Sequence, residues 1–487
     1  MTEHSHETQQ HANPVNQQQT LWPAPTALHP LHATVSIPGS KSLSNRYLIL
    51  AALSSQPITI HGLLRSRDTN LMIEALQQLG VRIEQESASS TTVRIIPPKF
   101  GNHQQTTGTL ESRNGLHPRF HGNTTIFCGL AGTVMRFLPA LALFADGPIS
   151  FDGDSQAYAR PMQPLLDGLK QLGAKIEYTG KPGFLPFIVT APDKPSEHKV
   201  RIDSSSSSQF ISGLLLAASC LPDGLKLQHT GATLPSLPHI RMTMTDIVNA
   251  GGHVSFDAQT NTWTVSPAKL KLPETVTVEP DLSNAAPFLG AALLATGTVQ
   301  VPFWPETTTQ PGGLLPDFLS RMGATVDFPE AAGIRYCRVV SHGDIHGLGD
   351  FDLEAAGELA PSLAALLTFA DSKTTMLGIA HLRGHETNRL AAMVAEIRRV
   401  GGDAEEVEDG IIIRPVEPQR LHNAVIRSYH DHRMATFGAM LGLRISGTQV
   451  ENIETTRKTL PDFVGMWENM LSCDSADTIS DSVHYRS

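Results

Sequence analysis

The segment PGSKSLSNR, from Pro38 to Arg46, combines three serines with Lys41, the first lysine or arginine of the chain. A strand-type run, TVSI, precedes it and a helix-type run, NRYLILAAL, follows it. Free N–H groups at a helix start, the helix dipole and a lysine together favour a bound anion. The segment lacks the spacing of a Walker A loop, and in isolation it could also be a capped helix start beside a solvated lysine.

Three further segments place glycine, arginine or hydroxyl groups at predicted element ends. In GLAGTVMRF, Gly132 opens a helix at a point where a ligand could approach the backbone closely. In AYARPMQPL, Arg160 precedes a proline and is therefore extended or in a turn. Five consecutive serines, Ser204 to Ser208, and Gln209 stand before a long apolar helix and could hold a phosphate. The ordinary alternatives are a plain helix entry, a solvated arginine and a flexible linker.

The C-terminal part contains three more polar clusters, in HLRGHETNRL, SYHDHRMA and TTRKTLPDF. They contribute Arg383, His385, Glu386, Arg389, Asp431, His432, Arg433, Arg457 and Lys458. Any one of these clusters alone would be an ordinary charged surface. Together they gather cations at predicted element ends in a chain whose net charge is −10. The sequence therefore predicts a local cationic site for an anionic ligand.

The composition argues against several other classes of protein. With 487 residues and 40% hydrophobic content, the chain can bury a large core in two or more domains. The negative net charge argues against nucleic-acid binding, which needs a basic face. No apolar run reaches the roughly 18 residues that span a bilayer, and residues 1–40 lack the basic residues of a signal or transit peptide. We therefore expect a cytoplasmic protein with neither nucleic-acid nor membrane partners.

The four cysteines are far apart in the sequence and form no C-x-x-C pair: Cys128, Cys220, Cys337 and Cys473. This spacing argues against a zinc cluster and against a disulfide framework. We expect no metal site, and we interpret the cysteines as buried or incidental thiols.

A phrase that ends a helix at a glycine and then begins a strand occurs five times: LQQLGVRIE, LKQLGAKIE, IVNAGGHVSF, LSRMGATVDF and IRRVGGDAEEV. We place the helix-ending glycines, in left-handed caps, at Gly80, Gly173, Gly252, Gly323 and Gly402. Helices that end in glycine are common in α/β proteins, but this spacing suits small strand–helix–strand subdomains. With the helical segment 462–471 in a sixth copy, we expect six units in two groups of three. The tails 1–26 and 472–487 are predicted to be disordered, and Gly101 to His121 to be a surface insertion.

Eight segments occur in the order seen in the 5-enolpyruvylshikimate-3-phosphate synthase family, which the chain resembles from about Ala27 to Leu471: PGSKSLSNR, LAGTVMR, ARPMQPL, SSSQF, EPDLSNAAPFL, RGHETNRL, DHRMA and KTLPDF. The resemblance implies an α/β fold, a two-domain inside-out α/β barrel with three βαβαββ units in each domain and the active site in the interdomain cleft. It implies a discontinuous domain 1 of residues 27–40 and 279–471, and a domain 2 of residues 41–278. It implies a monomer that needs no metal or other cofactor.

The family's reaction moves the enolpyruvyl group of phosphoenolpyruvate onto the 5-hydroxyl of shikimate 3-phosphate and releases phosphate through a tetrahedral intermediate. The resemblance gives catalytic roles to Lys41, which touches both substrates, to Glu358, which deprotonates the hydroxyl, and to Glu386, which serves proton transfer to the methylene carbon. The positions that match the shikimate 3-phosphate site are Lys41, Ser42, Arg46, Ser207, Ser208, Gln209, Ser236, Glu358 and His385. Those that match the phosphoenolpyruvate site are Lys41, Gly132, Arg160, Gln209, Arg389, Arg433 and Lys458.

Six positions depart from the family pattern. They are Leu130, Phe137, His239, Glu358, His381 and His385, where the family usually has asparagine, proline, tyrosine, aspartate, asparagine and lysine. Glu358 adds a methylene that its neighbours must accommodate, and His385 could titrate where a lysine would not. We interpret these differences as a variant of the family.

Two alternative functions remain to be tested. UDP-N-acetylglucosamine enolpyruvyl transferase shares the fold and phosphoenolpyruvate, but it has a Lys-Asn pair at the first motif and a loop cysteine before its Arg-Pro segment. Here Ser42 follows Lys41, and DSQAYARP contains no cysteine. A catalytically silent phosphometabolite-binding protein would keep the cationic pocket without needing Glu358 and Glu386, since a fold alone does not prove activity.

Overall fold

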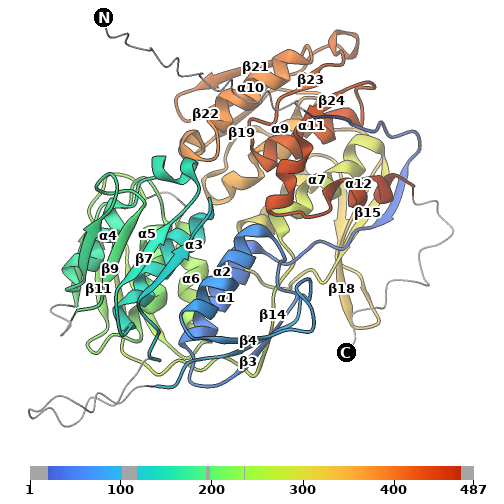
Figure 1. Ribbon diagram of the computed structural model, residues 1–487. Coiled ribbons are helices and arrows are strands. Elements are labelled where there is room, and N and C mark those ends of the chain that lie inside the picture. Colours follow the sequence, from blue (N-terminus) through green and yellow to red (C-terminus); the bar gives the residue numbers. More distant parts are fainter. Residues whose placement is uncertain (1–19, 101–117, 193–197, 235, 473–487) are drawn as a thin grey trace, which may run out of the picture.

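The computed structural model describes residues 20–100, 118–192, 198–234 and 236–472, and within them the strands form six small sheets (Figure 1). Five sheets share one order, in which a parallel pair is followed by two antiparallel strands: β14–β3–β5–β4, β6–β7–β9–β8, β10–β11–β13–β12, β2–β15–β18–β16 and β19–β20–β22–β21. The sixth sheet, β23–β24–β1, has the parallel pair and one antiparallel strand. The short strand β17 pairs with β18 only. The strand pattern is therefore complete in five sheets, and the sixth has the same pattern without its last strand.

The strands of the first three sheets are β3 (Ile58–His61), β4 (Arg82–Glu84), β5 (Val93–Ile96), β6 (Thr124–Phe127), β7 (Ile149–Asp152), β8 (Lys175–Tyr178), β9 (Phe187–Thr190), β10 (Lys199–Ile202), β11 (Leu225–His229), β12 (His253–Asp257), β13 (Thr262–Ser266) and β14 (Thr275–Thr277). Those of the other three are β1 (Leu21–Pro23), β2 (Leu31–Thr34), β15 (Gly297–Pro302), β16 (Thr325–Asp327), β17 (Glu330–Ala331), β18 (Ile334–Ser341), β19 (Gly349–Asp352), β20 (Thr374–Leu377), β21 (Asp403–Val407), β22 (Gly410–Arg414), β23 (Val425–Ile426) and β24 (Gln449–Glu451).

Two helices accompany the strands of each sheet in chain order. The α-helices are α1 (Lys41–Leu53), α2 (Arg67–Gln78), α3 (Gly132–Phe137), α4 (Gln163–Gln171), α5 (Gln209–Ala218), α6 (Leu237–Asn249), α7 (Leu282–Ala295), α8 (Leu315–Arg321), α9 (Ala360–Leu367), α10 (Arg389–Arg399), α11 (His432–Gly442) and α12 (Phe463–Ser472). In residues 124–190 and 199–266 the order strand–helix–strand–helix–strand–strand is uninterrupted. Where the two parallel strands follow each other in the chain, as in β6–β7, β10–β11, β19–β20 and β23–β24, the helix between them makes the crossover connection that a parallel pair needs.

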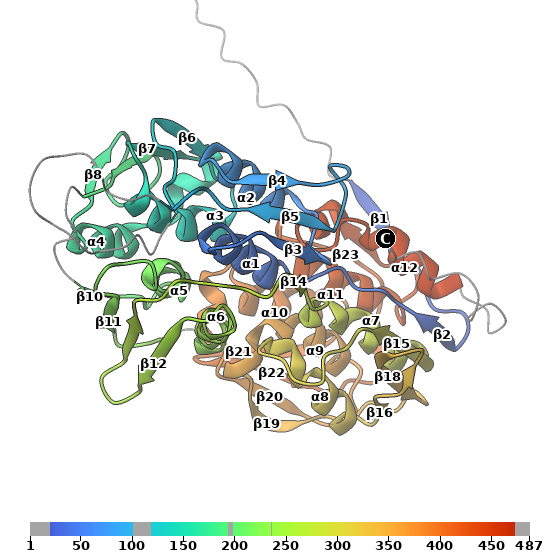
Figure 2. The same cartoon turned by 90° about the horizontal axis from the view of Figure 1, so that it is seen from below.

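The buried hydrophobic side chains form two separate clusters. The first runs from Leu43 to Val278, and the second combines residues 24–37 with residues 282–470. Figure 2 shows the same division, with the N-terminal strand β2 beside α12 of the C-terminal part. The chain passes from one cluster to the other twice, and the two passages pair: the Ser40 N–H donates to the Glu279 carbonyl over 2.8 Å, and Gly39 bridges Pro280.

Three details correct the sequence interpretation. In the two Gly-Gly phrases the left-handed residues are Gly251 and Gly401, with φ of 79° and 86°, and not Gly252 and Gly402. The helix thus ends one residue earlier, because the first glycine already supplies the αL cap. The predicted tail 1–26 is also too long, since Leu21–Pro23 form β1 and pair antiparallel with β24.

Two contacts explain why the segment Leu21–Pro23 is an ordered strand. Strand β24 would otherwise leave a bare edge, and Trp22 packs edge-on against Phe463 with ring centroids 6.3 Å apart. Residues 1–19, 101–117 and 473–487, which contain most of the predicted tails and insertion, lie outside the described residues. The cysteines Cys128, Cys220 and Cys337 are buried free thiols, and Cys473 also lies outside the described residues.

Candidate active site

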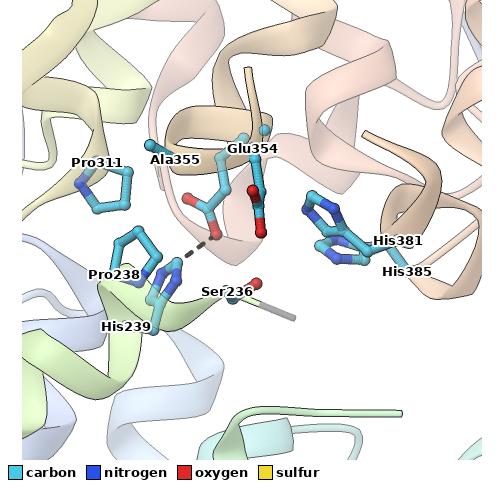
Figure 3. Close-up of a pocket in the computed structure, with 10 residues that line it drawn as sticks. Ser236, Pro238, His239, Pro311, Glu354, Ala355, His381 and His385 are labelled. Atoms are coloured by element: carbon cyan, nitrogen blue, oxygen red, sulfur yellow. Dashed lines mark ion pairs between the residues drawn. The ribbon is translucent and has the colours of Figure 1, made fainter. Parts of the chain in front are cut away.

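A small pocket lies where the two hydrophobic clusters face each other. Ser236, Pro238 and His239, at the start of α6, line one side of it. The other side comes from the C-terminal cluster and consists of Pro311, Glu354, Ala355, Gly357, Glu358, His381 and His385. Figure 3 shows His239 on the opposite side of this pocket from His381 and His385. The pocket is thus built by both parts of the chain, with titratable side chains on each side.

Lys41 is the first residue of α1, where Ser40 caps the helix by accepting from the N–H of Leu43 over 3.5 Å. Its ammonium lies 3.5 Å from the carboxylate of Asp68 on α2, and both side chains are largely buried. Burial lowers the pKa of Lys41, the charge of Asp68 opposes this lowering, and the charge of Lys458 from the other cluster adds to it. Lys41 is therefore not a solvated surface lysine.

Arg46, one turn further along α1, is 2% exposed and bonds mainly to α6. Its Nε donates to the Thr243 hydroxyl over 2.8 Å, and its Nη2 donates to the His239 carbonyl over 3.0 Å. Its Nη1 donates to the Ser42 carbonyl over 2.9 Å. Burial lowers the pKa of Arg46 to about 10, with the charge of Asp246 opposing this effect. Arg46 thus holds the first turn of α6 against the first turn of α1.

Gly132, Arg160 and Gln209 come together although they lie far apart in the sequence. A methyl group on Gly132 would lie 2.9 Å from Gln209 Oε1 and 3.1 Å from an Arg160 nitrogen. Gln209 Oε1 accepts from Arg136 Nη1 over 2.9 Å, and the Ser207 hydroxyl accepts from the same nitrogen over 3.1 Å. Since Gly132 begins α3 and Gln209 begins α5, two helix starts converge here, where an anion is favoured.

The hydroxyls of Ser208 and Ser236 lie at the starts of two neighbouring helices. Ser208 is the N-cap residue of α5 and Ser236 that of α6, and neither side chain makes a capping bond. Ser236 has a left-handed backbone, with φ 54° and ψ 46°. Their hydroxyls are therefore not used by their own helices.

Glu358 receives contacts from both clusters. Its Oε2 accepts from Arg433 over 2.7 Å, and its Oε1 lies 3.5 Å from Nε2 of His239, the pair drawn as a dashed line in Figure 3. Burial lowers the pKa of His239, so this contact joins a neutral imidazole to a carboxylate; among the described residues it is the one contact at ion-pair distance between the part 41–278 and the rest. Burial would raise the pKa of the Glu358 carboxyl, but the charge of Arg433 outweighs it and leaves the pKa well below its usual range.

Glu386 lies between two cations. Its Oε2 accepts from Arg389 over 2.9 Å, and its Oε1 pairs with Lys458. Arg389 is 2% exposed and also donates from Nε to the buried Asp431 over 2.7 Å. Burial would raise the pKa of Glu386, but the charges of Lys458 and Arg389 hold it well below its usual range.

The two histidines of the C-terminal wall are close to each other, with ring centroids 5.7 Å apart. His385 Nδ1 lies 3.1 Å from an Arg389 nitrogen. Burial, and then the charge of Arg389, lower the pKa of His385 to about 3. Burial also lowers the pKa of His381. Both rings are thus neutral at physiological pH, and His385 does not replace the charge of a lysine.

The predicted residues therefore form two groups on facing walls. Lys41, Ser42, Arg46, Gly132, Arg160, Ser207, Ser208, Gln209 and Ser236 belong to the first wall, and Glu358, His385, Glu386, Arg389, Arg433 and Lys458 belong to the second. Within the described residues, no hydrogen bond joins Arg160 or Gln209 to any residue of the second wall. The binding assignments themselves stay predictions.

Arg136, Asp431 and His239 contact the predicted set, although no binding or catalytic role was assigned to them from the sequence. Arg136 bonds to Ser207 and Gln209, Asp431 bonds to Arg389, and His239 pairs with Glu358. Arg136 and Asp431 stand inside motifs that the sequence had already singled out, so their position in LAGTVMR and DHRMA was an available signal. No signal in the sequence connected His239 with Glu358.

The arrangement suits chemistry on a small, multiply charged anion. Lys41, Arg389, Arg433 and Lys458 provide positive charge in a largely buried setting, where electrostatic interactions are stronger than in water. Glu358 and Glu386 provide two carboxylates that could exchange protons with a ligand. Within the described residues no cluster of His, Cys, Asp or Glu fits a metal ion, and none of the described helices is long and apolar enough to cross a membrane.

Comparisons with known proteins give a consistent result. The family model described as EPSP synthase (3-phosphoshikimate 1-carboxyvinyltransferase) matches residues 25–467. A 3-phosphoshikimate 1-carboxyvinyltransferase of Bifidobacterium longum (strain DJO10A) is 64% identical over 453 residues, which is 93% of this chain and 98% of that protein. Two solved structures of EPSP synthase from Acinetobacter baumannii superpose with TM-scores of 0.75 and 0.72. Each superposition covers 93% of this chain and 98% of the solved chain, at 23% sequence identity. At that identity the two structures support the fold alone.

Proposed function

Because this chain belongs to the EPSP synthase family, we propose that its two facing walls bind the two substrates of that reaction and catalyse it. The enzyme transfers the enolpyruvyl group of phosphoenolpyruvate to shikimate 3-phosphate and releases phosphate, a step of aromatic amino-acid biosynthesis. The observation that carries the assignment of the site is the pairing of Glu358 and Glu386 with three cations, opposite Lys41.

We assign the ligands to the walls by charge and by hydroxyl groups. Shikimate 3-phosphate would use the hydroxyls and N–H groups at the starts of α5 and α6, together with Lys41, Ser42 and Arg46. Its ring would lie in the pocket between His239, Glu358 and His385. The phosphate and carboxylate of phosphoenolpyruvate would lie between two sets of residues. These are Gly132, Arg160 and Gln209 on one side, and Arg389, Arg433 and Lys458 on the other.

The ion pairs also suggest how the two carboxylates become able to take protons. Glu358 has a pKa well below its usual range partly because Arg433 lies 2.7 Å away, so in this state it is a poor base. When the anionic groups of phosphoenolpyruvate share the charge of Arg433, Arg389 and Lys458, less positive charge remains on Glu358 and Glu386. The pKa of both carboxyls should then rise. Substrate binding would itself activate the proton acceptors.

In the proposed reaction, Glu358 takes the proton of the 5-hydroxyl while the hydroxyl oxygen forms a bond to C2 of phosphoenolpyruvate. The methylene carbon C3 takes a proton in the same step from the Glu386 carboxyl, which has first taken that proton from solvent as its pKa rises in the substrate complex. In the second step C3 returns a proton to the Glu386 carboxylate, the double bond between C2 and C3 forms again, and the bond between C2 and the phosphate oxygen breaks so that phosphate leaves. Lys41, Arg389 and Lys458 stabilise the negative charge on the departing phosphate.

We extend the proposal to the remaining expectations. The two hydrophobic clusters and the six repeated sheets support two domains, residues 27–40 with 279–471 and residues 41–278, each arranged as an inside-out α/β barrel. A site completed within one chain supports a functional monomer, and the sequence supports a cytoplasmic location. Size-exclusion chromatography with light scattering would test the monomer directly.

Release of phosphate from phosphoenolpyruvate tests the function. We expect release with shikimate 3-phosphate and none with UDP-N-acetylglucosamine. Glu358→Gln should lower kcat by about 10² to 10⁴, the usual contribution of a general base, and should leave the melting temperature nearly unchanged. Glu354→Gln is the matched control, because Glu354 lines the same pocket but forms no ion pair within the described residues. A Glu358→Gln variant with normal turnover would remove Glu358 from the mechanism, and release with neither acceptor would indicate a silent binding protein.

A further inference from the structure

The sheet that precedes α5 and α6 ends in a buried histidine. Strands β10 and β11 are parallel, with Ile202 opposite His229 at the last position of both. Since both strands end at the same edge, the segments that follow them, which lead to α5 and α6, leave from neighbouring points. His229 is 4% exposed and lies between these two segments.

Both ring nitrogens of His229 are used, and their partners fix the tautomer. The backbone N–H of Ser204 can only donate, and it lies 3.1 Å from Nδ1. Nδ1 must therefore be the acceptor. The carbonyl oxygen of Thr233 can only accept, and it lies 3.0 Å from Nε2, so Nε2 carries the hydrogen. One neutral imidazole thus connects the segment before α5 to the segment before α6.

Each partner leads directly to a residue of the proposed phosphate site. The Ser204 hydroxyl donates to the Ser207 carbonyl over 2.5 Å. The Ser207 hydroxyl in turn accepts from the Gln209 N–H over 3.3 Å and from Arg136 over 3.1 Å. On the other side, Thr233 stands three residues before Ser236, the N-cap residue of α6. His229 is therefore connected to Ser207 through Ser204, and to Thr233, which precedes Ser236 by three residues.

The turn after His229 leaves no free space. A methyl group on Gly231 would lie 2.0 Å from the Ser205 hydroxyl, 2.1 Å from Asp203 Oδ1 and 2.8 Å from His229 Cε1. The Ser205 N–H donates to Asp203 Oδ1 over 2.9 Å, which fixes the start of the serine run. The two segments are thus packed directly against each other, and His229 is the side chain that hydrogen-bonds to both.

We propose that His229 is a positioning residue for the phosphate of shikimate 3-phosphate. It holds the serine segment before α5 and the segment before α6 at the separation that lets Ser207, Ser208 and Ser236 bind one phosphate together. His229 itself touches no substrate. The inference rests on the proposed function, because it concerns the binding of the phosphorylated acceptor.

Two substitutions separate the two bonds of the ring. Asparagine can place its Oδ1 near the position of Nδ1 and keep the bond from Ser204, whereas glutamine can place its Nε2 near the distal nitrogen and keep only the bond to Thr233. We expect His229→Gln to raise the KM for shikimate 3-phosphate about tenfold, the effect of one lost buried hydrogen bond, and to leave kcat and the KM for phosphoenolpyruvate within about twofold. His229→Asn loses the other bond, to Thr233, and should raise the same KM to a similar extent.

A third variant tests the next bond of the chain, and the activity of the unmodified enzyme separates failure of this inference from failure of the proposed function. Ser204→Ala removes the next bond of the chain, to the Ser207 carbonyl, and should also raise the KM for shikimate 3-phosphate alone. If the unmodified enzyme releases no phosphate with this acceptor, the proposed function fails. If it is active and His229→Gln has an unchanged KM for shikimate 3-phosphate, His229 has no positioning role. The same conclusion follows if His229→Gln lowers kcat and raises both KM values in proportion to a lower melting temperature.

Discussion

At the residue scale, Gly132 shows how little space separates the side chains of the first wall. A methyl group on Gly132 would approach Gln209 Oε1 and Arg160, both at the end of movable side chains. We therefore expect Gly132→Ala to fold normally but to displace these two groups within the proposed phosphoenolpyruvate site. The KM for phosphoenolpyruvate should rise several-fold, and glyphosate, an inhibitor of this family that should compete with phosphoenolpyruvate, should inhibit less. Steady-state inhibition at several phosphoenolpyruvate concentrations measures both effects, and equal inhibition of both proteins would contradict the assignment of Gly132.

A second residue, Asp246 on α6, predicts how stability depends on pH. Asp246 is 2% exposed, and its Oδ2 has no hydrogen-bond partner. Burial raises its pKa to about 7, although the charge of Arg46 opposes this effect, whereas in an unfolded chain the pKa is about 3.9. Between these values the folded protein keeps a proton that the unfolded chain releases, so the free energy of unfolding falls as the pH rises from about 4 to about 7.

Asp246→Asn should remove this dependence. Its stability relative to the unmodified protein should increase by about 1.4 kcal/mol for each pH unit between 4 and 7. Loss of the charge beside Arg46 adds only an offset to the difference, because Arg46 remains protonated over this range. Urea unfolding at pH 4.5, 6 and 8 measures the difference, and parallel curves for the two proteins would show that Asp246 is not protonated in the folded state.

The same scale shows what the sequence could and could not predict. The cations Lys41, Arg389, Arg433 and Lys458 were found because cationic motifs stand out in an acidic chain. Their pairing was not predictable, since the bond between Arg433 and Glu358 joins residues 75 positions apart. The sequence left open whether His385 titrates near neutral pH, and burial beside Arg389 keeps it neutral. Burial and distant partners decide these properties, and neither can be read from a motif.

At the element scale, the periodic phrases predicted the helix ends and the repeated unit, because a glycine cap and an alternating strand are local signals. The strands that complete two of the sheets were not predictable in this way. Strand β14 pairs with β3 although more than 200 residues separate them, and β1 pairs with β24 across almost the whole chain. Such pairings depend on where the chain passes between the two clusters.

That passage gives a prediction for an element. A methyl group on Gly39 would lie 2.0 Å from the backbone oxygen of Gly62, which cannot move without disturbing the pairing of Val278 with His61. Gly39→Ala should therefore lower the melting temperature by several degrees, as expected for about 1 to 3 kcal/mol of overpacking. Gly384→Ala is the control for stability, because no atom lies within 4 Å of the added methyl. An unchanged melting temperature for Gly39→Ala would mean that the two chain passages adapt freely.

At the scale of the whole molecule, the two walls meet through groups of like charge as well as through the pair of His239 and Glu358. Burial lowers the pKa of Lys41 on the first wall and repulsion from Lys458 on the second wall lowers it further, while the charges of Glu386 and Glu358 oppose this effect. An anion held between the walls would offset this repulsion, so ligand binding and the approach of the two parts should be coupled.

Shikimate 3-phosphate and phosphoenolpyruvate should therefore raise the melting temperature together by more than the sum of their separate effects. Their joint presence should also reduce the radius of gyration measured by X-ray scattering. Lys458→Met removes one of the opposed charges, and it should weaken the effect of phosphoenolpyruvate while leaving that of shikimate 3-phosphate. Additive temperature shifts with a constant radius would mean that the two walls bind their ligands independently and that no closure accompanies the reaction.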